Sequence, residues 1–440
     1  MDYAGRRLRL RKTAPQGDIL ILSASYVPRN YPAEIYPFHQ DATFRYFTGL
    51  TEPNAALLIK ADGTEILFVT PPDPDDVIWT GPVPSPEMLA ERAKIAHTAN
   101  YADLDKHLTA HTLWIDPYDF QLKLRLATWL SVAPNQLATL ASRELGRAII
   151  ALRSVKDDDE VAELNEAITL TKRMISSAQA ALEPGRLESD ILAALLAPAI
   201  AKERDQAFNP IVTTHGETLH NSGYGHKIEA DDMLVLDCGA ESREGYCADI
   251  TRTLPASGRF SEQKQALYAA VLKAQLAGIA QTKVANTTQY DVHIAACRAL
   301  TEALQAIGLM RGNIDDSVAN GAHALFLPHG IGHMLGLDAH DMENYGDDVG
   351  YAPGTKRSTQ FGLDALRLAR KLEPGFVLTV EPGCYFIPEL IDRWAATKHL
   401  AEFINYDEVA KYRDMRGIRI EDDILITPTG SIVLGPGIDK

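Results

Sequence analysis

Apolar and polar positions follow different patterns in two parts of the chain. Residues 18–150 contain short apolar runs, such as 18–22 and 65–69, which alternate with helical stretches and turn signals. This pattern predicts a small α/β domain. Longer amphipathic segments begin after Arg153, so we expect one domain over residues 1–153 and a second over residues 154–440.

A long helix is predicted just after this boundary. The acidic residues 157–160 favour a helix N-terminus, because the helix dipole stabilises negative charge there. Pro184 and Gly185 mark its end. Its apolar side comprises Val161, Leu164, Ile168, Ile175, Ala178 and Leu182. The stretch 262–310 is rich in Ala, Leu and Gln and predicts two further helices, so helices are expected to cover a sheet in this domain.

A β-hairpin is predicted between residues 234 and 250, with its turn at residues 242–245. Asp237 and Asp249 lie symmetrically about Arg243, so we expect them to face each other directly, with Cβ atoms roughly 4.5 to 5.5 Å apart. Two negative charges at that distance repel, which favours a cation between them. The alternative is that both aspartates are solvated residues of the hairpin.

Histidines cluster between residues 329 and 340. His329, His333 and His340 all lie in this segment, although the whole chain has only 13 histidines, and such clustering indicates a function rather than core packing. Gly330 and Gly332 would let the backbone approach a site closely. Further on, an arginine and a glutamate at positions 419 and 421 are two residues apart on a predicted strand, so they share one face.

Five side chains of the second domain form a candidate metal-binding set. Four are carboxylates and one is an imidazole, which makes a hard, oxygen-rich set suited to two divalent cations that activate water. These residues are Asp237, Asp249, His333, Glu381 and Glu421. The set predicts a metal-dependent hydrolase.

Net charge and cysteine usage limit the kinds of partner and the cellular location that we expect. The 440 residues carry a net charge of −16, which argues against nucleic acid or an anionic membrane surface as a partner. No apolar run approaches the length of a membrane span. The four cysteines lack C-x-x-C spacing, so we expect reduced packing residues and a cytoplasmic protein. The N-terminal arginines are expected to lie on a solvated helix face rather than in a targeting signal.

Six motifs then carry a family resemblance. In order and spacing, DCG, ADITRT, HGIGH, GLDAHD, TVEPG and GIRIEDD resemble the metal-dependent prolyl peptidases, prolidase and aminopeptidase P, and FHQDATFRYFTGLTEPNAALLI resembles their N-terminal domain. The resemblance implies an α/β (α+β) fold, with a small N-terminal creatinase/prolidase-like domain and a C-terminal pita-bread catalytic domain. It also implies a homodimer that acts on proline-containing dipeptides or short peptides.

The same resemblance assigns roles to individual residues. Asp237, Asp249, His333, Glu381 and Glu421 match the ligands of two divalent metal ions, for which Mn²⁺ is expected and Co²⁺ or Zn²⁺ would also fit. Glu381 is also expected to accept a proton. His220, His340 and Arg419 match residues around the substrate and the hydrolytic intermediate, and His329 is expected to bind substrate.

The segment 361–375 bears on which prolyl peptidase this is. It resembles prolidases, in which the arginine at the position of Arg367 holds the C-terminal carboxylate of the dipeptide. We therefore expect an Xaa-Pro dipeptidase, with an Xaa-Pro aminopeptidase acting on longer peptides as the alternative. Arg367 could instead be a solvated basic residue on an exposed helix.

Two less favoured functions remain, together with one departure from the family pattern. A non-catalytic pita-bread binding protein fits poorly because such relatives typically lose ligands, and creatinase-like enzymes lack this ligand set. The departure is Phe208, which stands where the family usually has a tyrosine whose hydroxyl reaches the metal site.

Overall fold

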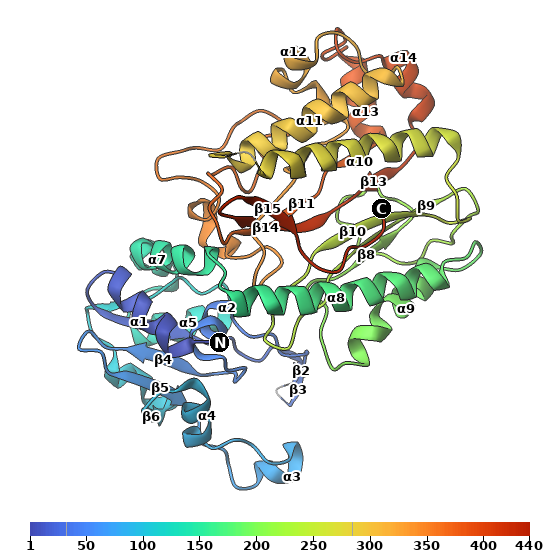
Figure 1. Cartoon of the computed structure of the whole chain (residues 1–440). Helices are drawn as coiled ribbons and strands as arrows, with labels where there is room; N and C mark the ends of the chain where they lie inside the picture. The colour runs from blue at the N-terminus through green and yellow to red at the C-terminus, as the bar shows by residue number, and fades with distance from the viewer. Residues whose placement is uncertain (32, 284) are drawn as a thin grey trace. The chain divides into compact units, whose positions relative to one another are not determined.

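The computed structural model describes residues 1–31, 33–283 and 285–440, and these form two units, Met1–Arg153 and Ser154–Lys440 (Figure 1). Both units mix helices and strands, as expected for the α/β (α+β) class. No helix among the described residues is long and apolar enough to cross a membrane.

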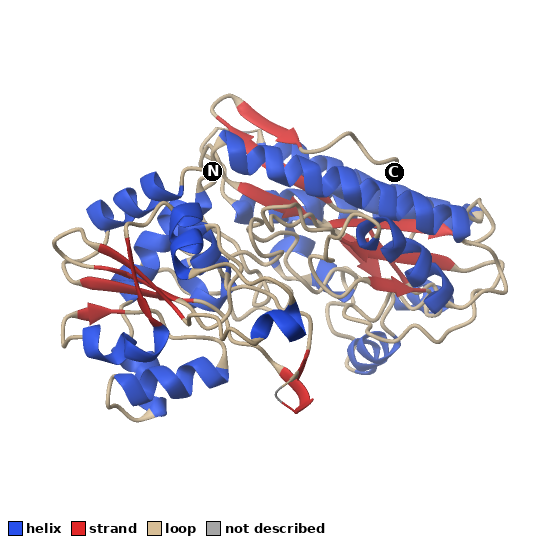
Figure 2. Ribbon diagram, turned by 90° about the horizontal axis from the view of Figure 1, so that it is seen from below, coloured by secondary structure: helices blue, strands red, loops and turns tan. Residues whose placement is uncertain are grey.

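The first unit is built around a five-stranded sheet in the order β6-β5-β4-β1-β7. Pairing is antiparallel in the middle of this sheet and parallel at its two edges. Helices lie on both sides of it (Figure 2). The strands are β1 (Asp18–Leu22), β4 (Ala56–Ile59), β5 (Glu65–Val69), β6 (His97–Asn100) and β7 (Thr112–Leu113), with a separate β2 (Pro28–Tyr31) and β3 (Glu34–Ile35) pair. The predicted strands at residues 18–22 and 65–69 are therefore confirmed.

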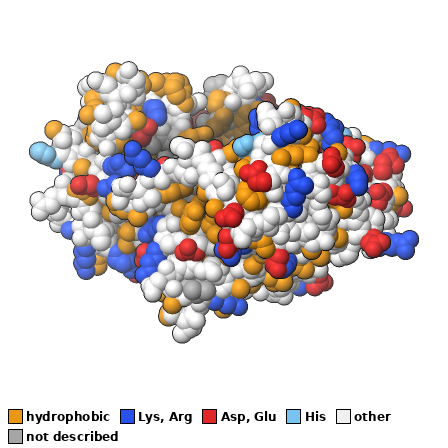
Figure 3. All heavy atoms as spheres, turned by 90° about the horizontal axis from the view of Figure 1, so that it is seen from above, with side chains coloured by type: hydrophobic (Ala, Val, Ile, Leu, Met, Phe, Trp, Pro, Cys, Tyr) orange, Lys and Arg blue, Asp and Glu red, His pale blue; other side chains and the backbone are white. Residues whose placement is uncertain are grey.

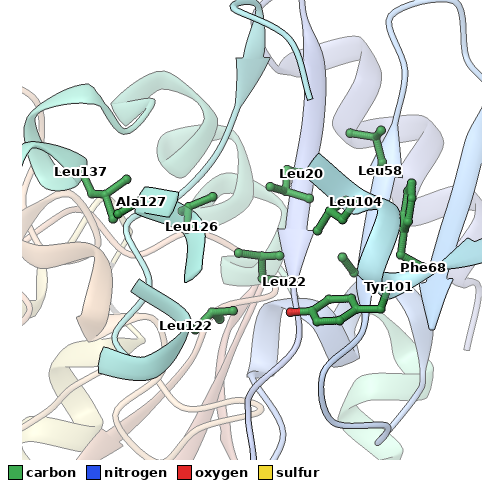
Figure 4. Close-up of a cluster of buried hydrophobic side chains, with 11 residues drawn as sticks. Leu20, Leu22, Leu58, Phe68, Tyr101, Leu104, Leu122, Leu126, Ala127 and Leu137 are labelled. Carbon is green, nitrogen blue, oxygen red and sulfur yellow. The ribbon is translucent and has the colours of Figure 1, made fainter. Parts of the chain in front are cut away.

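Apolar side chains from the sheet and the helices form the core of this unit. Leu20, Leu58 and Phe68 from the strands pack with Leu104 and Leu126 (Figure 4). Burying each such side chain is worth about 1.5–3 kcal/mol, so this cluster stabilises the unit. The helices and 3₁₀ turns include α1 (Tyr3–Thr13), α2 (Ala42–Thr48), α3 (Asp76–Thr80), α4 (Pro86–Ala93), α5 (Phe120–Trp129), α6 (Leu137–Leu140), α7 (Arg143–Ser154), η1 (Tyr101–His107) and η2 (Pro134–Gln136).

Helix α1 differs from the sequence expectation. Arg6 and Arg7 are buried, with 1% and 0% of their surface exposed, so the prediction of a solvated arginine face was wrong for these two residues. Arg7 donates to the carbonyl oxygens of Phe47, Ala93 and Lys94 and to the Glu65 carboxylate. Carbonyl oxygens at the ends of α2 and α4 thus hold the guanidinium. Both helices are distant from Arg7 in the sequence, so a local sequence pattern cannot reveal these partners.

The second unit consists of small antiparallel sheets with long helices packed against them. The sheets have the orders β10-β9-β8, β11-β14-β15 and β12-β13. The long helices α8 and α10 run on opposite sides of the strands (Figure 1). The strands are β8 (Ile211–Thr213), β9 (Met233–Cys238), β10 (Ile250–Pro255), β11 (Val377–Val380), β12 (Gly383–Tyr385), β13 (Gly417–Arg419), β14 (Asp422–Thr427) and β15 (Gly430–Val433).

The predicted helices of this unit are confirmed. Helix α8 (Asp158–Ala181) starts at a capping box between Asp157 and Glu160 and buries Leu164, Ile168, Ile175 and Ala178 from the predicted apolar side. The segment 262–310 contains two helices. The helices and 3₁₀ turns beyond α8 include α9 (Glu188–Ile200), α10 (Glu262–Thr282), α11 (Gln289–Ala306), α12 (Ile314–Ala319), α13 (Pro388–Ala396), α14 (Tyr406–Val409), η3 (Ala322–Leu325), η4 (Glu343–Asp348) and η5 (Ala410–Tyr412).

The β9–β10 hairpin exists, but its predicted register was wrong. Asp237 pairs with Thr251, and Asp249 lies just before β10, so the two aspartates are staggered rather than directly opposite. The cause is the turn. Ser242 accepts from the Gly245 N–H, Gly245 adopts φ +80°, and Glu241 pairs with Cys247, so the hairpin is centred on Glu244, one residue later than expected.

Candidate active site

A cavity of about 590 Å³ in the second unit brings together every site residue predicted from the sequence. Its wall also includes Phe208 and Tyr224. The predicted residues that line it are His220, Asp237, Asp249, His329, His333, His340, Arg367, Glu381, Arg419 and Glu421. These residues come from positions up to two hundred apart in the sequence, so the fold rather than local structure assembles them.

Strand ends position the acidic side chains. Asp237 lies near the end of β9 and Asp249 immediately precedes β10. Glu381 directly follows β11, and Glu421 lies between β13 and β14. Backbone hydrogen bonds fix each strand. The four acidic side chains, at or next to strand ends, line the cavity.

His333 lies among the acidic side chains. Its Nε2 is 3.5 Å from Asp249 Oδ2 and 3.6 Å from Glu381 Oε1. Ligand atoms of Asp249, His333 and Glu421 all lie within 4.8 Å of one another. His333 Nδ1 lies 3.0 Å from the carbonyl oxygen of Met334, which must accept from an N–H, so Nε2 is the nitrogen directed at the carboxylates.

Close approach of the backbone makes this arrangement possible. A Cβ on Gly332 would lie 2.3 Å from the Thr379 carbonyl oxygen, and one on Gly330 would lie 2.9 Å from the Leu366 Cα. Neither position has room for a side chain. The expectation that these two glycines permit close backbone approach is confirmed.

Burial raises the pKa values of carboxylates in the cavity. Burial raises the pKa of Asp249 to about 6 and that of Glu381 to about 7, and it raises the pKa of Glu421 well above its usual range. Burial opposes the charged form of His333, but its hydrogen bond to Asp249 and the Glu381 charge raise its pKa to about 9. A cluster of buried carboxylates favours either protonation or the binding of cations, since both reduce the repulsion between negative charges.

An unpartnered oxygen shows that the residues fit a metal. Asp237 is 8% exposed, and its Oδ1 has no hydrogen-bond partner among the described residues. Its Oδ2 accepts from Arg419 Nη2 at 2.6 Å. Arg419 thereby orients the carboxylate and leaves Oδ1 available as a ligand atom. Oxygen donors with one imidazole suit hard or borderline divalent cations.

Arg419 ends β13 and Glu421 lies before β14, so the single strand expected for both is interrupted, and Thr251 connects their side chains. The Thr251 hydroxyl accepts from Arg419 Nε at 3.3 Å and donates to Glu421 Oε2 at 2.7 Å. Thr251 stands opposite Asp237 in the hairpin. The Thr251 hydroxyl thus fixes the position of the Arg419 guanidinium relative to the Glu421 carboxylate, a candidate metal ligand.

A hydrogen-bond chain also runs from Arg419 to His329 through Tyr385. Arg419 Nη1 donates to the Tyr385 hydroxyl oxygen at 3.0 Å, and that oxygen lies 2.9 Å from His329 Nε2. His329 Nδ1 lies 2.9 Å from the Gly330 carbonyl oxygen, so Nδ1 carries the proton and Nε2 accepts from Tyr385. Burial and the Arg419 charge lower the pKa of His329 to about 4, which keeps the ring neutral.

His340 and Arg367 meet at Glu343. Glu343 lies 3.1 Å from His340 Nδ1 and 2.5 Å from Arg367 Nη1. Burial acts against its charged form, but the His340 hydrogen bond and the Arg367 charge lower its pKa to about 2. The His340 ring stacks on that of His333 at 3.9 Å. Residues 361–370 form turns and bends rather than the helix of the alternative, but Arg367 is exposed, as that alternative expected, with 44% of its side chain accessible.

Sequence reasoning missed Tyr385, Glu343 and Thr251. Tyr385 follows Glu381 in the TVEPG-containing segment, and Thr251 lies in ADITRT, so both belong to motifs that had been recognised. Glu343 follows GLDAHD by two residues. The signal was present in each case, but only the structure shows which atoms these side chains contact. His220 lines the cavity from an exposed position between β8 and β9.

Comparison with protein families decides the class. Residues 162–428 match the model of metallopeptidase family M24, and residues 3–113 match the aminopeptidase P N-terminal domain. The chain belongs to metallopeptidase family M24. It is therefore an enzyme of the hydrolase class with the expected pita-bread fold, and this family requires divalent metal.

Individual relatives point to one branch of the family. The chain is 33% identical over 418 residues to a probable Xaa-Pro aminopeptidase of Aspergillus niger, covering 90% of this chain and 85% of the relative. A second, from Talaromyces marneffei, is 32% identical with 90% and 84% covered. These relatives favour the alternative we kept open, an Xaa-Pro aminopeptidase, over the Xaa-Pro dipeptidase we expected first.

Solved structures agree with that preference. Aminopeptidase PepP of Pseudomonas aeruginosa superposes with a TM-score of 0.81 at 27% identity, covering 100% of this chain and 95% of that one. A zinc-substituted Escherichia coli aminopeptidase P in complex with product gives a TM-score of 0.81 at 26% identity, with 100% and 95% covered. The fold and both domains are thus those of aminopeptidase P.

Proposed function

We propose that this chain is an Xaa-Pro aminopeptidase that releases the first residue from peptides with proline in second position and at least one residue beyond it. One observation carries the proposal. Arg367, the group expected to hold the carboxylate of a dipeptide, is ion-paired with Glu343 in the cavity wall, and Arg419 is paired with Asp237. A free carboxylate next to proline would have to compete with Glu343 for Arg367.

Two divalent cations are proposed to bind Asp237, Asp249, His333, Glu381 and Glu421. Held there, such ions would supply Lewis acidity, which lowers the pKa of a coordinated water from about 15.7 towards about 7. Mn²⁺ is the proposed metal because carboxylate oxygens dominate the set. The unpartnered Asp237 Oδ1 and the raised pKa values of the carboxylates support these assignments.

The surrounding residues are proposed to move protons and orient groups. Glu381 accepts the proton of the attacking water from its position directly after β11, beside His333 in the cavity. His340 stabilises the developing oxyanion or the leaving nitrogen from its position against His333. Arg419 positions Asp237, while His220 and His329 line the wall where the substrate lies.

A substrate panel tests the proposal. Purified protein loaded with Mn²⁺ should cleave Xaa-Pro-Yaa tripeptides with at least about tenfold higher kcat/KM than the matching Xaa-Pro dipeptides, since the dipeptide places its carboxylate beside Glu343 at a cost of about 1.4 kcal/mol or more. Preference for dipeptides would move the assignment back to prolidase. No cleavage of either, with both metals bound, would contradict a prolyl peptidase altogether.

The Arg367→Ala variant sharpens this test. If Arg367 serves mainly as the partner of Glu343, its loss should change tripeptide and dipeptide cleavage by similar factors. A selective rise in KM for dipeptides would instead identify Arg367 as a carboxylate clamp. Lys371→Ala is the matched control, because Lys371 is an exposed cation four residues away that does not line the cavity.

Location and assembly also remain proposals. The four cysteines at positions 238, 247, 297 and 384 are free and buried, which supports a reducing compartment such as the cytoplasm. The homodimer expected from the family resemblance can be checked by the mass of the purified protein in solution.

A further inference from the structure

A second cluster of potential metal ligands lies in the same unit outside the catalytic set. His293 and Cys297 project from α11, and His323 lies in η3. The two residues on α11 are four apart, so they occupy one face of the helix. All three are fully buried, and their ligand atoms lie within 4.8 Å of one another.

Hydrogen bonds within the protein leave this cluster unsatisfied. His323 Nδ1 and Nε2, and His293 Nδ1, have no partner among the described residues. The contact that is present joins Cys297 Sγ and His293 Nε2 at 3.4 Å. Buried imidazoles are normally hydrogen-bonded, and a metal takes one nitrogen of a ring, so it is the His323 ring, with no partner at either nitrogen, that indicates a missing ligand.

We propose that His293, Cys297 and His323 bind one structural metal ion of the zinc class, separate from the catalytic pair. Zn²⁺ takes imidazole nitrogen at about 2.0–2.1 Å and thiolate sulfur at about 2.3 Å, which places N and S about 3.5 Å apart at a tetrahedral angle. The observed separation of 3.4 Å matches this value. Three protein ligands leave the fourth position to a small ligand such as water.

Protonation is compatible with metal binding at neutral pH. Burial lowers the pKa of His293 to about 3 and that of His323 to about 4, so both rings are neutral and keep a lone pair for a metal. Burial raises the pKa of the Cys297 thiol, so the metal must displace its proton. One proton leaves for each metal bound at this site, and affinity rises with pH.

The position of the cluster suggests what the metal does. It would tie η3 to α11, and the chain continues from η3 directly to Pro328 and His329 in the cavity wall. The Phe326 carbonyl in between accepts from the Tyr385 N–H. A metal here would therefore hold the segment that carries His329 against α11.

Cobalt substitution tests the proposal with a signal that the catalytic site does not give. The catalytic set contains no sulfur, so a thiolate-to-cobalt charge-transfer band in the near ultraviolet can arise only at a cysteine site. We expect protein already loaded with Mn²⁺ to develop this band with about one equivalent of Co²⁺ at pH 8. Cys247→Ser, which alters another buried cysteine, should retain the band, and Cys297→Ser should lose it.

A ligand variant on the second element completes the test. His323→Phe preserves a ring of similar shape and should weaken Co²⁺ binding, measured by the band, at least about tenfold. Absence of the band in wild-type protein at saturating cobalt would overturn the proposal, and this result does not depend on any variant folding. The proposal would equally fail if the band survived in Cys297→Ser, required Cys247, or titrated unchanged in His323→Phe.

Discussion

Glu421 shows how strongly one buried carboxylate depends on a cation. It is 2% exposed, and burial together with the neighbouring acidic groups raises its pKa well above the usual range. Its Oε2 is held by the Thr251 hydroxyl. Without a metal this side chain is costly to ionise, whereas with a metal its charge becomes a source of affinity.

The Glu421→Gln variant separates the cost of burying the carboxyl group from its contribution to metal affinity. Gln keeps the size of the side chain and can still accept from Thr251, but it removes the anionic ligand, so metal affinity should fall at least about tenfold and activity with it. Melting of the metal-free variant should be unchanged or higher, because no buried carboxyl must be accommodated. Metal analysis and thermal unfolding check both parts, with the exposed Asp414→Asn as control. Full metal content in Glu421→Gln would refute its role as a ligand.

Phe208 lacks the hydroxyl of the tyrosine that the family usually has at this position. Its ring lines the cavity, and the nearby Tyr224 hydroxyl donates to the Pro210 carbonyl at 2.7 Å, so Tyr224 does not simply replace the missing group. Phe208→Tyr should leave metal content unchanged and raise kcat several-fold, since one hydrogen bond to the intermediate is worth about 0.5–1.5 kcal/mol. Steady-state kinetics measure the effect, with Phe361→Tyr as the control outside the cavity. Lower turnover would indicate that the cavity accommodates only phenylalanine there.

Helix α1 is attached to its unit by buried polar contacts as well as by the buried Leu10. Arg7 is fully buried and reaches three backbone carbonyl oxygens as well as the Glu65 carboxylate, at distances from 2.8 to 3.0 Å. Its Nε lies 2.8 Å from Glu65 Oε2. The helix therefore acts as a clamp that joins the ends of α2 and α4.

Replacing Arg7 should release this clamp. Arg7→Met keeps the apolar stem but leaves the carbonyls and Glu65 without their donor, so we expect the first unit to lose about 3 kcal/mol of stability. Denaturant unfolding measures the change. Arg9→Met, on the same helix with a side chain 48% exposed, should cost less than about 0.5 kcal/mol. Equal effects of the two variants would show that the buried hydrogen bonds contribute nothing specific.

For the whole molecule, charge makes stability depend on both pH and metal. The chain has a net charge of −16, and acidic and basic side chains are interspersed over the face shown in Figure 3. Acidic side chains are concentrated instead inside the catalytic cavity. In the folded metal-free protein, burial places the pKa of Asp249 at about 6 and that of Glu381 at about 7. Both values lie above those of an unfolded chain, near 4.

The sign of the pH effect follows from these values. Between pH 4 and 7 Asp249 and Glu381 bind more protons in the folded metal-free protein than in the unfolded chain, so their contribution to stability falls as pH rises, and the His333 pKa of about 9 extends this loss to higher pH. Bound metal replaces the protons and removes the loss. The increase in Tm on adding Mn²⁺ should therefore grow from pH 5 to pH 8, as thermal scans of dialysed protein can measure. A constant or shrinking increase would contradict the buried-carboxylate account.

Several features were determined by the sequence alone. The order and identity of the acidic and histidine side chains were readable because each lies in a short motif, and all of them line the cavity. Strands β1 and β5 and helices α8, α10 and α11 were predictable because their apolar periodicity is local. The family resemblance followed from the same short segments.

Only the tertiary structure decided the remainder, because it depends on partners distant in the chain or on the exact position of a turn. The Gly245 turn set the stagger of Asp237 and Asp249. Distant carbonyls buried Arg7, which a local pattern assigned to solvent. Glu343 pairs with Arg367 from 24 positions away, so a substrate carboxylate would meet an arginine that already has a partner. These contacts form only after folding brings the segments together, so no pattern along the chain could specify them.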